Sequence, residues 1–431
     1  MTSTNPCETA YVCRICSSEF FQENLNLGLT PIANELYPDY ESAISADKYP
    51  LILRMCSSCR HVQLNHTVSA QRLFNSYVYS SSTSETFRNH FISLANEIKD
   101  VSKKKLKVIE VGSNDGFLID QLASLGFETL GIEPSQALVK KSQSLGLNII
   151  QAYLSDETVR KIQNEFGIAD IVIGNNVFAH IDDISEAMSN VNQLLKPNGT
   201  FILEVAYLRD LFERNLFDSI YHEHISYHSL YSLNILLRNV GFKIIKVSRI
   251  STHGGSIRVW AQKIDKEEAK VSTENAELLD LIDEEISLGL TNPSLLLEMA
   301  KKVDQLKSEV DQFIGGLDDN SFNFGYTAPA KLVTFLSQID LGRLKLRCIV
   351  DDNVSKQKMF VAGFGLEIVS SQVLIDRFQD YYQQNKATSS AICLVFAWNI
   401  TDEIASKIHE KFTSDLKIIT FLGGVKELKW K

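Results

Sequence analysis

The chain has 431 residues, of which 44% are hydrophobic and 22% charged, with a formal net charge of −10. This length exceeds what one hydrophobic core usually supports, so we expect two or three domains in a folded globular protein. The acidic balance disfavours a protein that mainly binds nucleic acid, which usually needs a basic face. The sequence has neither an apolar run long enough to span a membrane nor an N-terminal signal pattern, so we expect a cytoplasmic protein without a membrane partner.

Four of the seven cysteines form two Cys-x-x-Cys pairs, namely Cys13, Cys16, Cys56 and Cys59. In a reducing compartment such pairs indicate a metal rather than disulfides, and four thiolates are the tetrahedral set that zinc favours in structural sites. A closed four-sulfur site leaves no position for water, so we expect zinc to hold the fold and to take no part in chemistry. His61 and His66 are alternative candidates for one of the ligands.

From residue 105 to residue 263 the sequence alternates short β-rich runs with helical stretches. The expected strands are residues 106–111, 129–133, 148–151, 170–174 and 200–205. Strands that alternate with helices in this way predict a parallel sheet covered by helices.

The first of these strands runs into a loop with glycines, where a doubly wound sheet lets a ligand approach the backbone closely. A nicotinamide fingerprint would need glycines at Asn114 and Phe117, so the loop disfavours a dehydrogenase. The loop resembles instead the first motif of Rossmann-like S-adenosylmethionine methyltransferases, acidic-x-Gly-x-Gly-x-Gly. Glu110, Gly112 and Gly116 match that motif, and Asn114 departs from its commonest form. The plainer alternative is that the glycines only shape a tight turn.

Two later motifs support the same cofactor. Glu133 ends the second expected strand, where a carboxylate is placed to bind both ribose hydroxyls of an adenosine-bearing cofactor. Residues 170–180, which contain Asn175 and Asn176, and residues 195–200 resemble the fourth strand and the following turn of the same methyltransferases. We therefore expect S-adenosylmethionine to be bound by Glu110, Gly112, Asn114, Gly116, Glu133, Asn175 and Asn176.

The second half of the chain begins with a helical region and continues with another α/β pattern. Leucines and isoleucines recur at helical spacing among charged residues between 265 and 314, which predicts a helical connector. Strands are then expected around residues 323–326, 347–350, 391–396 and 418–422. The expected division is residues 1–80, 81–264, 265–315 and 316–431, for a metal-binding module, a core, a connector and a C-terminal α/β domain.

Residues 221–228 contain three of the nine histidines, two tyrosines and a glutamate. Histidine both accepts and donates protons near pH 7, and a tyrosine can stabilise an oxygen on which negative charge develops. Strand alternation would put Tyr221 and His224 on opposite faces, so a loop or helical turn is needed to bring them together. The alternative is that these histidines are solvated or satisfied by backbone hydrogen bonds.

Taken together, the motifs resemble the sugar C-methyltransferases of deoxysugar biosynthesis over essentially the whole chain. The matching elements are both cysteine pairs and residues 77–82, 110–116, 175–180, 221–224 and 325–331. The resemblance implies an α/β fold with a zinc-binding N-terminal module, a Rossmann-like S-adenosylmethionine methyltransferase core and a C-terminal Rossmann-like α/β domain. It also implies a nucleotide-linked 4-keto-6-deoxyhexose as substrate, methylated at its C3 carbon.

The resemblance further implies roles for the catalytic segment. His224 is the expected base for the C3 proton, which the neighbouring C4 ketone makes acidic, and the enolate carbon then attacks the sulfonium methyl group in line. Glu223 and Tyr221 are expected in the same pocket, where they orient the base or stabilise the enolate. Either Tyr77 or Tyr79 is expected to add a phenol.

Five further residues are expected to bind the substrate, namely His180, His253, Tyr326, Lys331 and Lys356. His253 stands in a polar, glycine-rich turn that it could equally serve to cap. The loop that contains Tyr326 and Lys331 stands where a strand-to-helix connection can cradle phosphate on backbone amides. The family often has glycine where Thr327 stands, and residues 351–356 are similar to its Asp-x-Asn-x-x-Lys element. A structural turn is the alternative for both elements.

Two other functions remain open on the sequence. One is a methyltransferase acting on oxygen or nitrogen with the same core, which would need no carbon base. The other is a non-catalytic protein that binds zinc and an adenosine ligand. The nucleotide base, the C3 substituent and the oligomeric state are not specified by these motifs.

Overall fold

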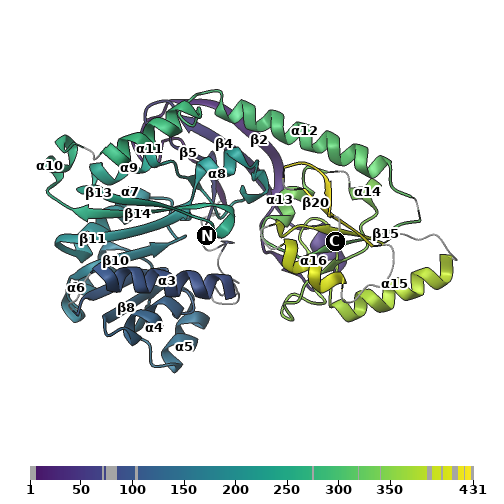
Figure 1. The fold of residues 1–431 in the computed structure, drawn as a ribbon, viewed down its shortest axis with the longest axis horizontal. Helices are drawn as coiled ribbons and strands as arrows, with labels where there is room; N and C mark the ends of the chain where they lie inside the picture. The colour runs from purple at the N-terminus through teal and green to yellow at the C-terminus, as the bar shows by residue number, and fades with distance from the viewer. Residues whose placement is uncertain are drawn as a thin grey trace, which may run out of the picture.

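The computed structural model describes residues 6–69, 72–73, 85–101, 105–273, 276–318, 320–339, 341–385, 391–398, 401–409, 416–421 and 423–428. Figure 1 shows one body built on a large sheet at the left and a second, smaller body at the right, with the long helix α12 (Leu295–Gly315) running along the top. Among the described helices, none is both long and apolar enough to cross a membrane.

The larger body is built on a seven-stranded sheet in the order β13-β14-β11-β10-β7-β8-β9. The strands are β7 (Lys107–Val111), β8 (Glu128–Glu133), β9 (Ile149–Gln151), β10 (Ala169–Asn175), β11 (Leu195–Ala206), β13 (Phe242–Ile250) and β14 (Ser256–Lys263). The pairs from β9 to β11 are parallel, as predicted, whereas β14 and β13 add an antiparallel edge. The Rossmann-like α/β core expected from the sequence is therefore confirmed.

The helices of this body are α3 (Glu85–Val101), α4 (Phe117–Ser124), α5 (Gln136–Ser144), α6 (Asp156–Glu165), α7 (Ile184–Leu194), α8 (Leu208–Glu213) and α9 (Leu230–Asn239). Side-chain caps define several of their starts: the Ser155 hydroxyl accepts from the Thr158 amide, and the Asp183 carboxylate accepts from the Glu186 amide. The chain leaves β7 toward β8 on one side and returns to β10 on the other. This reversal places a ligand crevice at the carboxyl ends of β7 and β10.

The N-terminal region packs against the core through a shared sheet. Its strands are β2 (Phe21–Pro31), β4 (Lys48–Cys56) and β5 (Val62–Leu64), and the fourth strand, β12 (Ser226–Tyr227), comes from the histidine-rich segment. Two smaller ladders join β1 (Cys7–Thr9) to β6 (His66–Val68) and β3 (Leu36–Tyr37) to β17 (Phe360–Val361). A short helix, α1 (Tyr40–Ile44), follows β3. The N-terminal region thus pairs with both halves of the chain, which the sequence patterns did not predict.

In the sequence, the two α/β units are separated by three helices: α10 (Lys266–Val271), α11 (Ala276–Ser287) and α12. Helix α11 does more than connect, because the buried carboxylate of Glu285 accepts hydrogen bonds from the backbone amides of Leu230 and Tyr231 at 2.6 and 2.8 Å. These amides open helix α9, so Glu285 caps it from another part of the chain.

The smaller body is a second doubly wound sheet, in the order β18-β16-β15-β19-β20-β21. Its strands are β15 (Phe322–Tyr326), β16 (Ile349–Val350), β18 (Ile368–Val369), β19 (Ala391–Val395), β20 (Leu416–Thr420) and β21 (Lys426–Glu427). All pairs are parallel except the last. Its helices are α13 (Leu332–Leu336), α14 (Leu341–Leu344), α15 (Ser371–Asn385) and α16 (Thr401–His409), and α13 lies at the junction with the larger body (Figure 1).

Candidate functional site

The four cysteines of the two pairs meet in one cluster. The sulfur atoms of Cys13, Cys16, Cys56 and Cys59 all lie within 4.8 Å of one another. Four sulfurs at the usual zinc–sulfur distance of about 2.3 Å from one tetrahedral ion would lie about 3.8 Å apart, so this set fits zinc. His61 is not needed as a ligand, since its Nε2 lies 3.3 Å from the Ser226 hydroxyl instead.

The zinc-binding loop is tied to the core through Arg14, which stands between two of the cysteines. Its Nε donates to the Asp182 carboxylate at 2.9 Å, and one terminal nitrogen donates to the Leu64 carbonyl oxygen at 2.9 Å. The Ser185 hydroxyl donates back to the Arg14 carbonyl oxygen at 3.2 Å. Asp182 comes two residues after His180, so the metal loop holds the segment that carries this histidine.

The glycine loop after β7 has the backbone that a cofactor loop needs. Gly112 has a φ of 70°, and a Cβ atom there would lie 2.9 Å from Cγ2 of Val177. Asn114 also adopts a left-handed conformation, with a φ of 50°. The Glu133 carboxylate accepts from the backbone amides of Asn114 and Ser135 at 3.0 and 2.9 Å. Glu133 thus fixes the loop, and its oxygens keep further lone pairs for ribose hydroxyls.

Glu110, Asn175 and Asn176 lie at the same edge of the sheet. Glu110 is only 3% exposed, and burial raises the pKa of its carboxyl group well above the usual value, with a smaller contribution from the nearby charges of Asp115 and Glu133. The nearby Asn175 side chain opposes this rise. The backbone amide of Asn176 donates to the Glu204 carbonyl oxygen at 2.7 Å. The expected cofactor residues therefore converge at the carboxyl ends of β7, β8 and β10.

A tight turn brings Tyr221 and His224 together, as the sequence argument required. The His224 amide donates to the Tyr221 carbonyl oxygen at 2.9 Å, and the Tyr221 hydroxyl lies 3.0 Å from Nε2 of His224. Nδ1 of His224 lies 3.1 Å from the Ser219 carbonyl oxygen. Because a carbonyl oxygen can only accept, Nδ1 carries the proton, and the Nε2 lone pair accepts from the tyrosine hydroxyl.

Glu223 and His180 adjoin this turn. The Glu223 carboxylate is 4% exposed and accepts from the Asn34 amide group at 3.4 Å, and burial raises its pKa to about 7. The rings of His180 and His224 lie 5.0 Å apart, edge to face. Burial lowers the pKa of His180 to about 4, so this ring stays neutral at pH 7. The site therefore combines a neutral His180, the His224 ring, a phenol and a carboxyl group that titrates near neutrality.

The other two histidines of the segment are structural. Nε2 of His222 donates to the Tyr49 carbonyl oxygen at 3.3 Å, and His228 packs on His61 with ring centroids 5.3 Å apart. Burial lowers the pKa of both His222 and His228 to about 4. The alternative of a buried histidine satisfied by the backbone is therefore correct for His222, whereas both ring nitrogens of the buried His228 lack a hydrogen-bond partner among the described residues.

The remaining expected residues either lie outside the described residues or have other partners. Tyr77 and Tyr79 lie outside the described residues, as does the side chain of His253, whose backbone belongs to a 3-10 turn, η3 (Thr252–Gly254). In the smaller body, Tyr326 donates to Asp352 at 3.0 Å, and Lys356 donates to the Ala328 carbonyl oxygen at 2.7 Å. Phosphate binding by these residues stays a prediction.

The side chain of Lys331 also contacts groups within the protein. Its ammonium group lies 3.5 Å from the centroid of the Trp398 ring, and it faces the Asp218 side chain across a small cavity. Burial lowers the pKa of Lys331, while the charge of Asp218 opposes that change. The loop motif predicts that Lys331 binds phosphate, and nothing in that motif predicts its contacts with Trp398 and Asp218.

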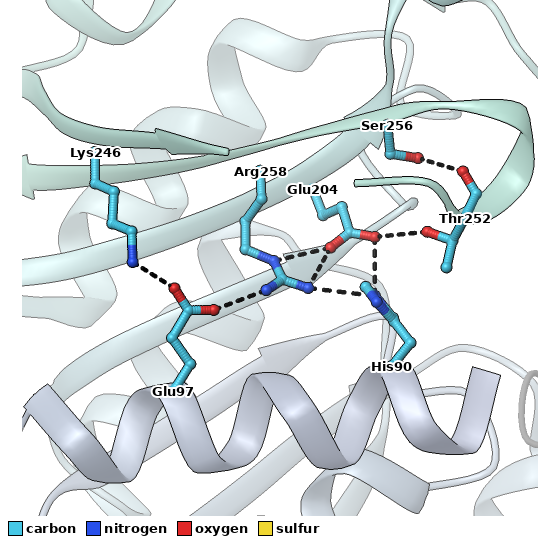
Figure 2. Close-up of polar contacts among 7 residues, drawn as sticks. All are labelled: His90, Glu97, Glu204, Lys246, Thr252, Ser256 and Arg258. Atoms are coloured by element: carbon cyan, nitrogen blue, oxygen red, sulfur yellow. Dashed lines mark hydrogen bonds and ion pairs between the residues drawn. The ribbon is translucent and has the colours of Figure 1, made fainter. Parts of the chain in front are cut away.

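A buried charge network, centred on Glu204, was not predicted from the sequence (Figure 2). The Glu204 carboxylate, at the end of β11, accepts from Nε of Arg258 at 2.9 Å, lies 3.0 Å from Nε2 of His90 and accepts from the Thr252 hydroxyl at 3.4 Å. Arg258 also donates to Glu97 at 2.8 Å. Burial alone would raise the pKa of Glu204, but His90 and Arg258 outweigh it and leave that pKa lowered. The network links helix α3 and turn η3 to strands β11 and β14.

Comparison with known proteins gives three family models in chain order. Residues 13–74 match a "Putative zinc binding domain", residues 86–247 a "Methyltransferase domain" and residues 251–422 a "C-methyltransferase C-terminal domain". The chain is 31% identical to C-methyltransferase NovU of Streptomyces niveus over 402 residues, which cover 92% of each protein. The match to this relative includes all three regions.

Other similar proteins match a smaller part of the chain. A ubiquinone biosynthesis O-methyltransferase of Rickettsia typhi is 27% identical over 110 residues, covering 24% of this chain and 42% of that protein. Among solved structures, magnesium protoporphyrin IX methyltransferase (ChlM) from Synechocystis PCC 6803 with bound SAM covers 41% of this chain and 79% of its own, at 20% identity. The TM-score of 0.33 is too low to support an inference from that match.

Proposed function

Because the chain belongs to the C-methyltransferase family, with zinc and S-adenosylmethionine as its cofactors, we propose that it methylates C3 of a nucleotide-linked 4-keto-6-deoxyhexose. The observation that carries the proposal is the fixed tautomer of His224, whose Nδ1 is held by the Ser219 carbonyl oxygen and whose Nε2 faces the Tyr221 hydroxyl. A carbon acid beside a ketone needs such a base.

The cofactor supplies an electrophilic methyl group on sulfur. In the proposal the cofactor binds at the carboxyl edge of the sheet, against Gly112, Asn114, Gly116, Glu133, Asn175 and Asn176. His180 follows a few residues later in the chain. Glu133 would accept from the ribose hydroxyls, and the left-handed loop would let the cofactor approach the backbone.

The proton steps are assigned to the turn. In the proposal, Nε2 of His224 takes the C3 proton, and the electron pair of that C–H bond moves into the enolate, whose negative oxygen was the C4 ketone. In the structure, which contains no substrate, the Tyr221 hydroxyl points at Nε2 of His224. In the proposal it turns to donate a hydrogen bond to the enolate oxygen. The enolate carbon then forms the new bond to the methyl group as the sulfur–methyl bond breaks. His180 stays neutral beside the imidazolium that forms, and Glu223 supplies a carboxylate near it.

Tyr326 and Lys356, at the rim of the C-terminal sheet, are the proposed contacts for the nucleotide. His253 and one of Tyr77 and Tyr79 remain proposed contacts for the sugar. A methyltransferase acting on oxygen or nitrogen removes no proton from carbon, and the O-methyltransferase relative matches only 24% of this chain, whereas the C-methyltransferase relative matches 92%. That reading is therefore the weaker one.

The test is an incubation with S-adenosylmethionine and a nucleotide-linked 4-keto-6-deoxyhexose in deuterated water, followed at C3 by NMR and mass spectrometry. We expect one added methyl on carbon, and its loss in His224→Ala. A His66→Gln variant, which removes a histidine from β6, serves as the control and should retain transfer. Methylation of oxygen, or full activity of His224→Ala, would refute the proposal.

A further inference from the structure

The C-terminal sheet has its own ligand crevice. The chain leaves β15 for β16 on one side and later forms β19 on the other, so the reversal of strand order lies between β15 and β19. In doubly wound sheets, ligands bind outside the carboxyl ends of the strands at this point. Lys331 follows β15 and Trp398 follows β19, so both stand at this position.

A segment of the larger body occupies this crevice. The Trp398 indole N–H donates to the carboxylate of Asp218, in the 3-10 turn η2 (Phe217–Ser219), at 2.8 Å. Asp218 is 7% exposed, and the cavity that remains between it, Lys331 and Trp398 measures about 10 Å³. That volume has room for about one water molecule. The Asp218 carboxyl group, whose pKa is raised by burial, therefore stands where other sheets of this type hold their ligand.

A second contact holds the next part of the same segment. The Thr334 hydroxyl, on helix α13, donates to the Ile220 carbonyl oxygen at 2.7 Å in a buried position. Asp218 and Ile220 flank Ser219, whose carbonyl oxygen accepts from Nδ1 of His224. The smaller body thus fixes the backbone on both sides of the group that sets the tautomer of the histidine.

We propose that the C-terminal domain is a positioning device for the catalytic turn, in which Trp398, Lys331 and Thr334 bind residues 218–220 as an internal ligand and so orient His224. Lys331 supplies the countercharge to Asp218 within that crevice and does not bind a phosphate of the substrate. The proposal rests on the proposed role of His224 as the base. It assigns the domain a catalytic contribution although none of its residues in this crevice touches the reacting atoms.

The first test compares Thr334→Val, which removes the hydroxyl at similar volume, with Thr334→Ser, which restores a donor. We expect kcat for methyl transfer to fall about 10-fold to 100-fold in Thr334→Val, since small misplacements of reacting groups have effects of this size. The KM for S-adenosylmethionine should stay within about 2-fold, and Thr334→Ser should recover most of kcat. Ser337→Ala is the matched control, because its hydroxyl bonds to Val333 within the same helix.

The second test needs no substrate and so separates this proposal from the proposed reaction. In protein labelled with ¹⁵N-histidine, a His224→Asn variant identifies the His224 ring signals. We expect the wild-type ring to be protonated at Nδ1 and Thr334→Val to show both tautomers. If Thr334→Val does not fold, Trp398→Phe keeps an aromatic side chain but removes the N–H donor to Asp218.

A wild-type tautomer and a wild-type kcat in both variants would overturn the positioning role. Loss of the tautomer preference in an enzyme that methylates no keto sugar would support positioning and refute the proposed reaction. Lys331→Met could instead bind the nucleotide sugar more weakly than wild type while the His224 signal stays unchanged. That result would mean that Lys331 binds the substrate, and it would overturn the role proposed for Lys331.

Discussion

The Arg14 guanidinium lies 2.9 Å from the Asp182 carboxylate, joining the zinc-binding loop to the segment that follows His180. The two ends of this contact differ, because the Arg14 side chain is 4% exposed and that of Asp182 is 64% exposed. The ion pair itself is therefore weak. The buried hydrogen bond of Arg14 to the Leu64 carbonyl oxygen and the partly buried one to the Thr67 hydroxyl carry most of the stabilisation.

Replacing Arg14 by methionine should therefore lower the free energy of unfolding by about 3 kcal/mol, since it leaves buried acceptors without their charged donor. Asp182→Asn should cost less than about 1 kcal/mol, because the partner is exposed to solvent. Urea unfolding of both variants with zinc present measures the difference. Equal effects of the two substitutions would mean that the ion pair, and not the buried bonds, holds the loop.

Zinc removal should affect catalysis more than cofactor binding. Through Arg14 and the β5–β12 pairing, the metal-bound region holds the catalytic segment, whereas the glycine loop after β7 belongs to the core. We expect about one zinc per chain by elemental analysis, and loss of methyl transfer on chelation while the Kd for S-adenosylmethionine changes less than about 3-fold. Cys59→Ser should lose the metal, and Cys7→Ser, which lies outside the cluster, should keep it. Full activity of metal-free protein would contradict this prediction.

The parts of the fold that the sequence predicted correctly are those with a local pattern. Strand β7 is a short β-rich run ending in a glycine loop, and the cysteine spacing specifies its own ligand set. The pairing of β12 with β5 was not predictable, since a two-residue strand has no periodicity to read. Its register depends on a contact between segments far apart in the chain.

The same distinction applies to the candidate site. The segment that contains His224 stands out because histidines are rare and this segment is rich in them, and the family resemblance selects His224 within it as the expected base. Ser219, Thr334 and Trp398 are ordinary residues whose importance comes from three-dimensional contacts, and no motif marks them. Glu204 was read only as part of a strand, yet it lies at the centre of a charge network because α3 and β14 bring His90 and Arg258 to it.

That network gives a prediction about a buried charge. Glu204→Gln preserves the shape but removes the anion that faces Arg258 and His90, and breaking a buried pair of this kind should cost about 3 kcal/mol of unfolding free energy. Lys246→Met removes the outer ion pair to Glu97, which is half-exposed, and should cost less than about 1 kcal/mol (Figure 2). Thermal and urea unfolding at constant pH measure both. A cost for Glu204→Gln no greater than that for Lys246→Met would contradict the assigned hierarchy.

The last prediction concerns acid stability and the buried pair His61 and His228. Burial lowers the pKa of His228 to about 4, and the nearby Phe178 backbone opposes this change. The pKa of His61 is lowered well below its usual value by burial and by the charge of His228. In the unfolded chain the pKa of a histidine is about 6.5. Above that pH both states are neutral and the group contributes nothing. Between about 6.5 and 4 the unfolded state binds a proton that the folded state does not, so falling pH favours unfolding.

From pH 7 to pH 5, this linkage removes about 2 kcal/mol of stability for a histidine with these two pKa values. Other buried groups titrate in the same range, and Glu223, whose pKa is raised to about 7, acts in the opposite direction. The His228 contribution is therefore read as a difference: the stability of wild type minus that of His228→Phe should fall by about 2 kcal/mol between the two pH values. Phe178→Leu, a neighbouring core change without a titrating group, should differ from wild type by the same amount at both. A pH-independent difference for His228→Phe would mean that this ring is protonated in the folded protein or reaches water.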